Sequence, residues 1–101
     1  MAAAPPRTLT FTVHGPIRRS DLEGLCARVC RLLDRSAADV AVCDVSDVPA
    51  DAVTVEALAR LQLGARHYGC RVRLQRASPE LRDLVRFMGL SDVFADDTPV
   101  P

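Results

Sequence analysis

Three aspartates, Asp44, Asp47 and Asp51, lie within eight residues and are the first candidates for chemistry. Carboxylate oxygens are the ligands of hard cations such as Ca²⁺, so this group could hold such an ion weakly. Aspartate also has two common structural roles, because its short side chain favours turns and caps helices. We therefore expect Asp47 in a turn and either Asp51 or Thr54 as the cap of the following helix, and we predict no metal site.

The other reactive side chains form no catalytic set. His14 and His67 are far apart in the sequence and are expected at the surface. Cys26 and Cys30 are one helical turn apart, but they also complete an apolar stripe, so we interpret the cysteines as small core residues. The junction after Cys43 has no glycine with which to cradle a phosphate. We therefore expect a protein that is not an enzyme and that needs no cofactor.

Composition favours one small globular domain. The chain has 101 residues, is 49% hydrophobic, and carries 13 basic and 13 acidic side chains. A net charge of zero gives no field that would attract nucleic acid or an anionic membrane. The sequence shows neither a membrane-spanning run nor a signal peptide, so we expect a cytoplasmic protein without direct membrane insertion. We predict a single domain over 8–94, with flexible tails at 1–7 and 95–101.

Strand and helix patterns alternate along the chain. Apolar residues at every second position, or in a short buried run, predict strands over 8–15, 39–45 and 70–77. Apolar stripes with helical spacing predict helices over 20–35, 54–69 and 78–90. This βαβαβα order is typical of an α/β fold with a small, mainly parallel sheet and packed helices. The half-polar first strand is expected at an edge, and an exposed sheet edge invites homodimerisation.

Local signals indicate where two of the helices begin. Ser20 and Glu23 have the spacing of a capping box. Gly24, just inside the same helix, suggests a close packing contact. Ser78 precedes Pro79 at the start of the last helix, where serine is a good N-cap and proline suits the first position.

The order of motifs resembles that of the STAS domain, which occurs in sulfate transporters and anti-sigma factor antagonists. The likeness covers about Leu9 to Phe94. "DVS" at 44–46 matches the family's strand end of aspartate, an aliphatic residue and serine. "SPEL" at 78–81 resembles the start of the last helix, and "GLSDVF" at 89–94 resembles its exit.

This resemblance implies a regulatory domain that acts by binding other proteins. In bacterial antagonists of this family the partner is an anti-sigma factor with kinase activity, which acts in signalling that controls transcription. It phosphorylates a serine at the start of the second helix, and the added charge weakens the contact. The resemblance therefore implies an anti-sigma factor antagonist-like module. The alternative is a structural subunit of a transporter-associated or signalling assembly, with a transporter ATPase as one partner.

The chain departs from the family at the phosphorylation site. Asp51 aligns with the motif aspartate, Ala52 with the first serine and Val53 with the phosphorylated serine. Thr54 is the nearest substitute hydroxyl, although helix capping is its simpler role. The family's usual first edge strand is also missing, as are its last strand and helix. We expect a module that is not switched at the usual position, with Val53 as an accessible contact. The expected partner-binding residues are Ser46, Asp47, Asp51, Ala52, Val53, Thr54 and Glu56.

Overall fold

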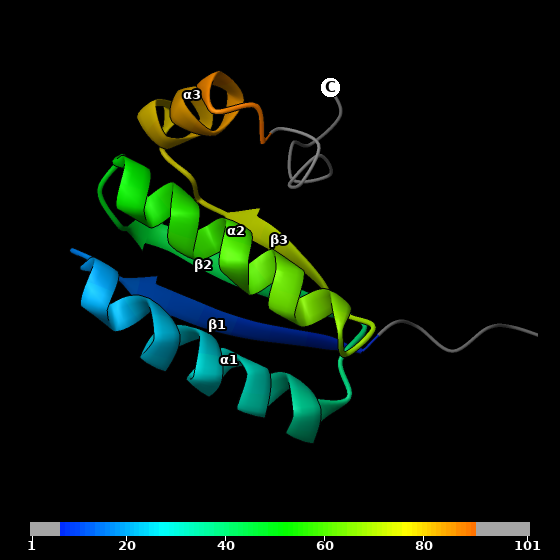
Figure 1. The fold of residues 1–101 in the computed structure, drawn as a ribbon. Helices are drawn as coiled ribbons and strands as arrows, with labels where there is room; N and C mark the ends of the chain where they lie inside the picture. The colour runs from blue at the N-terminus through cyan, green and yellow to red at the C-terminus, as the bar shows by residue number, and fades with distance from the viewer. Residues whose placement is uncertain (1–6, 91–101) are drawn as a thin grey trace, which may run out of the picture.

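The computed structural model describes residues 7–90, and the remaining parts of the expected domain and tails lie outside this range. Strands and helices alternate as the sequence patterns predict (Figure 1). In chain order the elements are β1 (Thr8–His14), the short 3-10 helix η1 (Arg19–Asp21), α1 (Leu22–Ser36), β2 (Val40–Asp47), α2 (Ala52–Arg66), β3 (Arg71–Gln75) and α3 (Pro79–Phe87).

The three strands form one parallel sheet in the order β1-β2-β3, so β1 lies at an edge as expected. The register places Phe11 beside Cys43, and Cys43 beside Leu74. Neighbouring residues in register share a face of the sheet, so this row belongs to a single face. Helices α1 and α2 lie side by side over that face (Figure 1). The α/β fold class is confirmed.

The two faces of the sheet differ in character. Along β3, Val72 and Leu74 are buried, whereas Arg71 and Arg73 are exposed on the opposite face. Thr10 of β1, Val42 of β2 and Arg73 of β3 lie in one row of the register. This row therefore belongs to the face of the sheet that carries Arg73. The core therefore occupies only the helix side of the sheet, and α2 supplies the largest share of its helical residues: Thr54, Val55, Ala57, Leu58, Leu61, Gln62 and Ala65.

The outer edge of β3 is closed by a side chain from α2. Gln62 donates from Nε2 to the Val72 carbonyl oxygen at 3.0 Å, and the Val72 amide donates to Gln62 Oε1 at 2.8 Å. Both residues are buried. Backbone groups buried without partners are costly, so this pair of bonds satisfies an edge that no further strand within residues 7–90 covers.

Two local expectations for α1 are wrong. A capping box from Ser20 and Glu23 does not form, because the chain first makes the 3-10 turn η1 and Asp21 accepts a hydrogen bond from the Arg18 amide at 3.1 Å. Gly24 has no atom within 4 Å of the place where a side chain would begin. The close contact is instead at Gly64 of α2, where an added Cβ would lie 3.1 Å from Cys30 Sγ.

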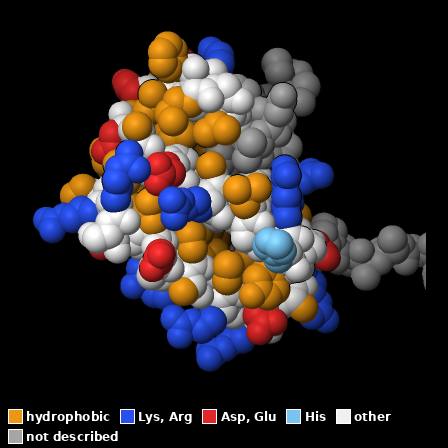
Figure 2. Space-filling view, in the orientation of Figure 1, with side chains coloured by type: hydrophobic (Ala, Val, Ile, Leu, Met, Phe, Trp, Pro, Cys, Tyr) orange, Lys and Arg blue, Asp and Glu red, His pale blue; other side chains and the backbone are white. Residues whose placement is uncertain are grey.

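The surface over the helices carries mixed charges. Arginine, acidic and hydrophobic side chains are interspersed on the face seen in Figure 2, and no single sign of charge dominates it. This distribution agrees with the balanced charge of the sequence. No helix within residues 7–90 has both the length and the apolar character needed to cross a bilayer.

Candidate contact surface at the ends of β1 and β2

The loops that follow β1 and β2 meet, because the two strands are parallel neighbours and end at the same edge of the sheet. The Gly15 amide donates to the Asp47 carbonyl oxygen at 3.1 Å. A Cβ at Gly15 would lie 2.5 Å from Pro49 Cδ, so the close approach of the loops depends on glycine at this position. We call residues 14–19 and 46–56 together the loop surface.

Asp44 is tied into the fold and is not part of the loop surface. It lies within β2 and is buried. Its carboxylate accepts a hydrogen bond from the Ser46 amide at 2.9 Å and forms an ion pair with Arg76, whose Nε lies 3.1 Å away. The Ser46 amide, followed by the Arg76 guanidinium, lowers the pKa of Asp44 to about 2. Asp44 is therefore ionised at neutral pH, and its oxygens already have partners.

The other two aspartates have separate roles. Asp47 Oδ2 lies 3.1 Å from His14 Nδ1, and both side chains are exposed. Asp51 is the N-cap of α2, since its Oδ1 accepts a hydrogen bond from the Thr54 amide at 2.8 Å. Of the two expected caps, Asp51 is the one that forms. No group of three metal-ligating side chains occurs within residues 7–90, so the acidic stretch is divided among three structural contacts.

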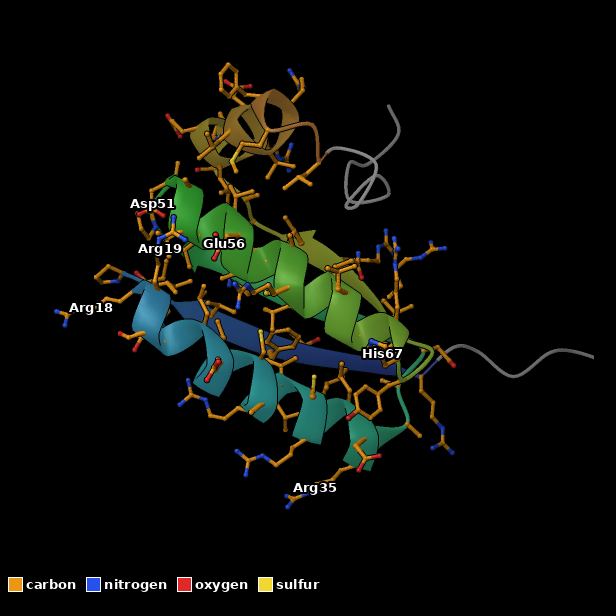
Figure 3. The ribbon with its side chains drawn as sticks, viewed as in Figure 1. Arg18, Arg19, Arg35, Asp51, Glu56 and His67 are labelled. Atoms are coloured by element: carbon orange, nitrogen blue, oxygen red, sulfur yellow. The ribbon has the colours of Figure 1, made fainter. Side chains whose placement is uncertain are left out.

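Glu56 connects the two halves of the loop surface. Its carboxylate lies 2.8 Å from Arg19 Nη1 and 3.4 Å from Arg60 Nη2. Figure 3 shows Arg19 and Glu56 approaching one another beside the start of α2, close to Asp51. Exposed ion pairs contribute little to stability, so the main consequence is positional. The Arg19–Glu56 pair holds the segment after β1 against the first turns of α2.

The first turn of α2 is less exposed than the sequence suggests. Ala52 is exposed, Val53 is half-buried and packs against the core, and Thr54 is completely buried. Thr54 Oγ1 has no hydrogen-bond partner within the described part of the chain. The expectation that Thr54 contributes to an accessible surface therefore does not hold for this conformation. The exposed uncharged residues of the loop are Ser46, Pro49, Ala50 and Ala52.

The part of the loop surface that follows β1 was not anticipated from the sequence. His14, Gly15 and Arg19 lie beside the β2–α2 loop because β1 pairs with β2. The stretch "LTFTVHGPI" at 9–17 resembles the first strand and turn of the STAS domain, but no motif or spacing places His14, Gly15 or Arg19 beside the β2–α2 loop. The one usable signal is the βαβ order, since parallel neighbouring strands bring their following loops to one edge.

The cysteines do not supply a nucleophile to this surface. Cys43 is completely buried, and burial together with the Asp44 charge raises its pKa to about 12. Burial also raises the pKa of Cys26 and Cys70. A thiol with a raised pKa stays protonated at neutral pH and is unreactive. Cys43 and Cys70 are core residues as expected, whereas Cys26 and Cys30 are only partly buried.

Comparison with solved structures finds proteins of similar fold. No protein-family model and no curated protein matches the sequence. The structure of a sulfate transporter family protein from Wolinella succinogenes superposes with a TM-score of 0.67 and 21% sequence identity. The match covers 92% of this chain and 75% of the other. At this level of identity the similarity concerns the fold, which is a small STAS-like α/β domain.

Proposed function

We propose that this chain is a regulatory protein-interaction module of the anti-sigma factor antagonist type, and that it is not switched by phosphorylation at the usual position. The claim that phosphorylation does not switch the module rests on the first turn of α2. Val53 has no hydroxyl, and the neighbouring Thr54 hydroxyl is buried. A kinase needs an accessible acceptor oxygen, and neither residue provides one in the folded chain.

The loop surface has features that suit a preformed contact. Its acidic groups already have partners, because Asp47 lies beside His14, Asp51 caps α2 and Glu56 pairs with Arg19. A partner would therefore meet a fixed arrangement of charges around a small apolar patch at Pro49, Ala50 and Ala52. Small residues allow close approach, and a contact that requires little ordering retains more of its binding energy.

Binding to a switch kinase of the anti-sigma class would test this proposal. We expect a complex whose affinity is the same with ADP and ATP, and whose STAS-like chain shows no added phosphate by intact mass. Ala52→Glu places a charge among these exposed small residues and should weaken binding at least about tenfold, a loss of about 1.4 kcal/mol. Ala27→Glu, on the exposed side of α1, is the matched control and should bind normally. Stoichiometric phosphate on residues 46–56 would contradict the proposal that phosphorylation does not switch this module.

A gain-of-function variant separates the missing hydroxyl from other causes. Val53→Ser restores an acceptor at the family's usual position, on a side chain that is half-buried and not enclosed. We expect phosphate to appear on Val53→Ser after incubation with the kinase and ATP, together with weaker binding. The double variant Val53→Ser/Thr54→Val should behave in the same way, because the Thr54 hydroxyl is enclosed. Binding by the wild-type chain without phosphorylation of Val53→Ser would mean that the partner does not present its active site here.

The second candidate is a structural subunit of a transporter-associated or signalling assembly. The solved protein of the same fold carries the name of the sulfate transporter family, which is the observation that favours it. Purification of a tagged copy from its native cell discriminates between the two. A stable, stoichiometric ATPase subunit would support the second candidate, whereas a kinase-like anti-sigma factor would support the first.

A further inference from the structure

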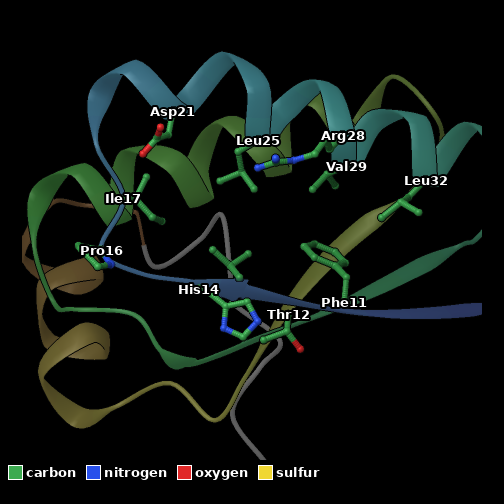
Figure 4. Close-up of a pocket in the computed structure, with 11 residues that line it drawn as sticks. Phe11, Thr12, His14, Pro16, Ile17, Asp21, Leu25, Arg28, Val29 and Leu32 are labelled. Carbon is green, nitrogen blue, oxygen red and sulfur yellow. The ribbon is translucent and has the colours of Figure 1, made fainter.

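A groove follows the outer side of β1, between this strand and α1. It has a volume of about 390 Å³. Leu25, Val29 and Leu32 line it from α1, and Phe11 lines it from β1 (Figure 4). Leu32 remains 43% exposed. The lining of the groove is therefore mainly apolar, its polar members are Thr12, His14, Asp21 and Arg28, and the groove is open to the outside.

The edge of β1 beside this groove has no strand partner within residues 7–90. In a strand, alternate residues direct their amide and carbonyl groups away from the neighbouring strand. On β3 the corresponding groups of Val72 are bonded to Gln62. The β1 edge has no comparable closing side chain in this part of the chain. An uncovered edge of this kind is a template for pairing with another chain.

Along one side of η1 and α1, an acidic and a basic residue alternate with apolar residues. Asp21, Leu25, Arg28 and Leu32 follow each other at intervals of four, three and four residues, which places them along one side of a helix. Asp21 and Arg28 are two helical turns apart. Arg28 forms no ion pair with any residue of 7–90, and Gly24 beside this face leaves open space.

The chain's own ends are poorly suited to this groove. The six residues before Arg7 lead directly into β1 and include Pro5 and Pro6, which have no amide donor for a ladder. At the other end, the described chain leaves α3 on the β3 side of the sheet (Figure 1). These features favour an occupant from another molecule.

We propose that a second copy of this chain covers the groove in a two-fold symmetric dimer. The two α1 helices pack antiparallel, so that Arg28 faces the partner's Asp21 and the same pair forms again on the other side of the axis. Leu25 and Leu32 of each copy are then covered by the other. The same axis sets the two β1 strands antiparallel, with their outward backbone groups facing. A contact of this isologous type uses one self-complementary patch, which is what the α1 charges provide.

Sedimentation equilibrium of the full chain, across micromolar concentrations, tests the proposal directly. We expect a concentration-dependent approach to twice the chain mass of 11.0 kDa. Arg28→Asp places like charges opposite one another and should raise the dimer dissociation constant at least about tenfold. The exchange Arg28→Asp/Asp21→Arg should recover most of this loss, because opposite charges face each other again. Arg82→Asp on α3 is the matched control and should dimerise normally.

Leu32→Glu provides an independent variant, since it adds a charge within the groove at a side chain that is already partly exposed. It should favour the monomer while circular dichroism and thermal unfolding of the monomer stay unchanged. A monomer at all concentrations would overturn the proposal. So would a dimer that Arg28→Asp and Leu32→Glu leave unchanged, because such a dimer would use another surface. His14, Pro16 and Ile17 line the groove and also belong to the loop surface, but the substituted residues Arg28 and Leu32 do not. These outcomes therefore test the dimer separately from the proposed function.

Discussion

The two edges of the three-stranded sheet differ in how their outward backbone groups are bonded. At β3, the Gln62 side chain takes both the donor and the acceptor of Val72 and replaces a missing neighbour strand. At β1, the edge meets a mainly apolar groove, and α1 beside it carries the exposed Leu32 and Arg28, which forms no ion pair with residues 7–90. A further strand could therefore pair with the β1 edge of the sheet more easily than with the β3 edge. We expect association with other molecules on the β1 side.

The largest expected effect comes from opening the β3 edge. Gln62→Leu leaves the buried amide and carbonyl of Val72 without partners, and each such group costs of the order of 1–3 kcal/mol. We expect the free energy of unfolding to fall by about 3 kcal/mol in a urea titration. Gln75→Leu, at an exposed position of β3, is the matched control and should change it by less than about 0.5 kcal/mol. A Gln62→Leu chain as stable as the wild type would show that Gln62 does not close this edge.

A smaller effect is expected where the C-terminal end of β1 is anchored. Gly15→Ala would place a Cβ 2.5 Å from Pro49 Cδ, so the two loops must separate. Overpacking of this kind costs about 1–3 kcal/mol, and we expect about 2 kcal/mol in thermal unfolding. Gly24→Ala makes the same substitution in open space within a helix and should stabilise the chain by up to about 1 kcal/mol. Equal shifts at the two glycines would contradict the close contact of the loops.

The N-terminal end of β1 is held more weakly. The Arg7 amide donates to Asp39 Oδ2 at 3.0 Å, and the Arg7 carbonyl accepts from the Asp39 and Val40 amides. Asp39→Ala removes the side-chain bond and should cost about 1 kcal/mol in the same urea titration. Asp39→Asn keeps an acceptor oxygen and should lose less. If the two variants were equally destabilised, the bond to Arg7 would not be the cause.

The most gradual change is expected on acidification. The folded pKa of Asp44 is lowered to about 2 from an ordinary value of 3.8. The contribution of this carboxylate to stability is therefore present above pH 4 and is lost as the pH falls toward 2, because the unfolded chain takes up the proton first. Melting temperatures measured between pH 5 and pH 2 should fall less steeply for Asp44→Asn than for the wild type. Parallel curves would mean that Arg76 and the Ser46 amide do not hold this charge.

Much of the fold could be predicted from the sequence because it depends on local periodicity. The strand expected over 8–15 is observed as Thr8–His14, and the strand expected over 39–45 as Val40–Asp47. Helix starts were less accurate, since the caps compete within one or two residues. Asp51 caps α2 where Thr54 was an equal candidate, and the η1 turn displaces the start expected at Ser20.

The ion pairs in and beside the loop surface could mostly not be predicted from the sequence. Asp44 pairs with Arg76, which is 32 residues away, and Glu56 with Arg19, which is 37 residues away. Such pairs follow from strand order and from the turn after β3, where Arg76 adopts a positive φ of 59°. Neither the strand order nor the positive φ of Arg76 can be recognised from the spacing of residues in the sequence. The β2–α2 loop itself was located correctly, because it follows a strongly apolar strand.

The enclosed hydroxyl of Thr54 has a consequence for any chemical mark found on this protein. No modifying enzyme could reach that oxygen while the first turn of α2 is formed. A covalent group on Thr54 would thus show that the first turn of α2 had unfolded locally at the time of the modification. Modification of Thr54 would therefore report local unfolding of the first turn of α2, and no modification is expected while this turn stays folded.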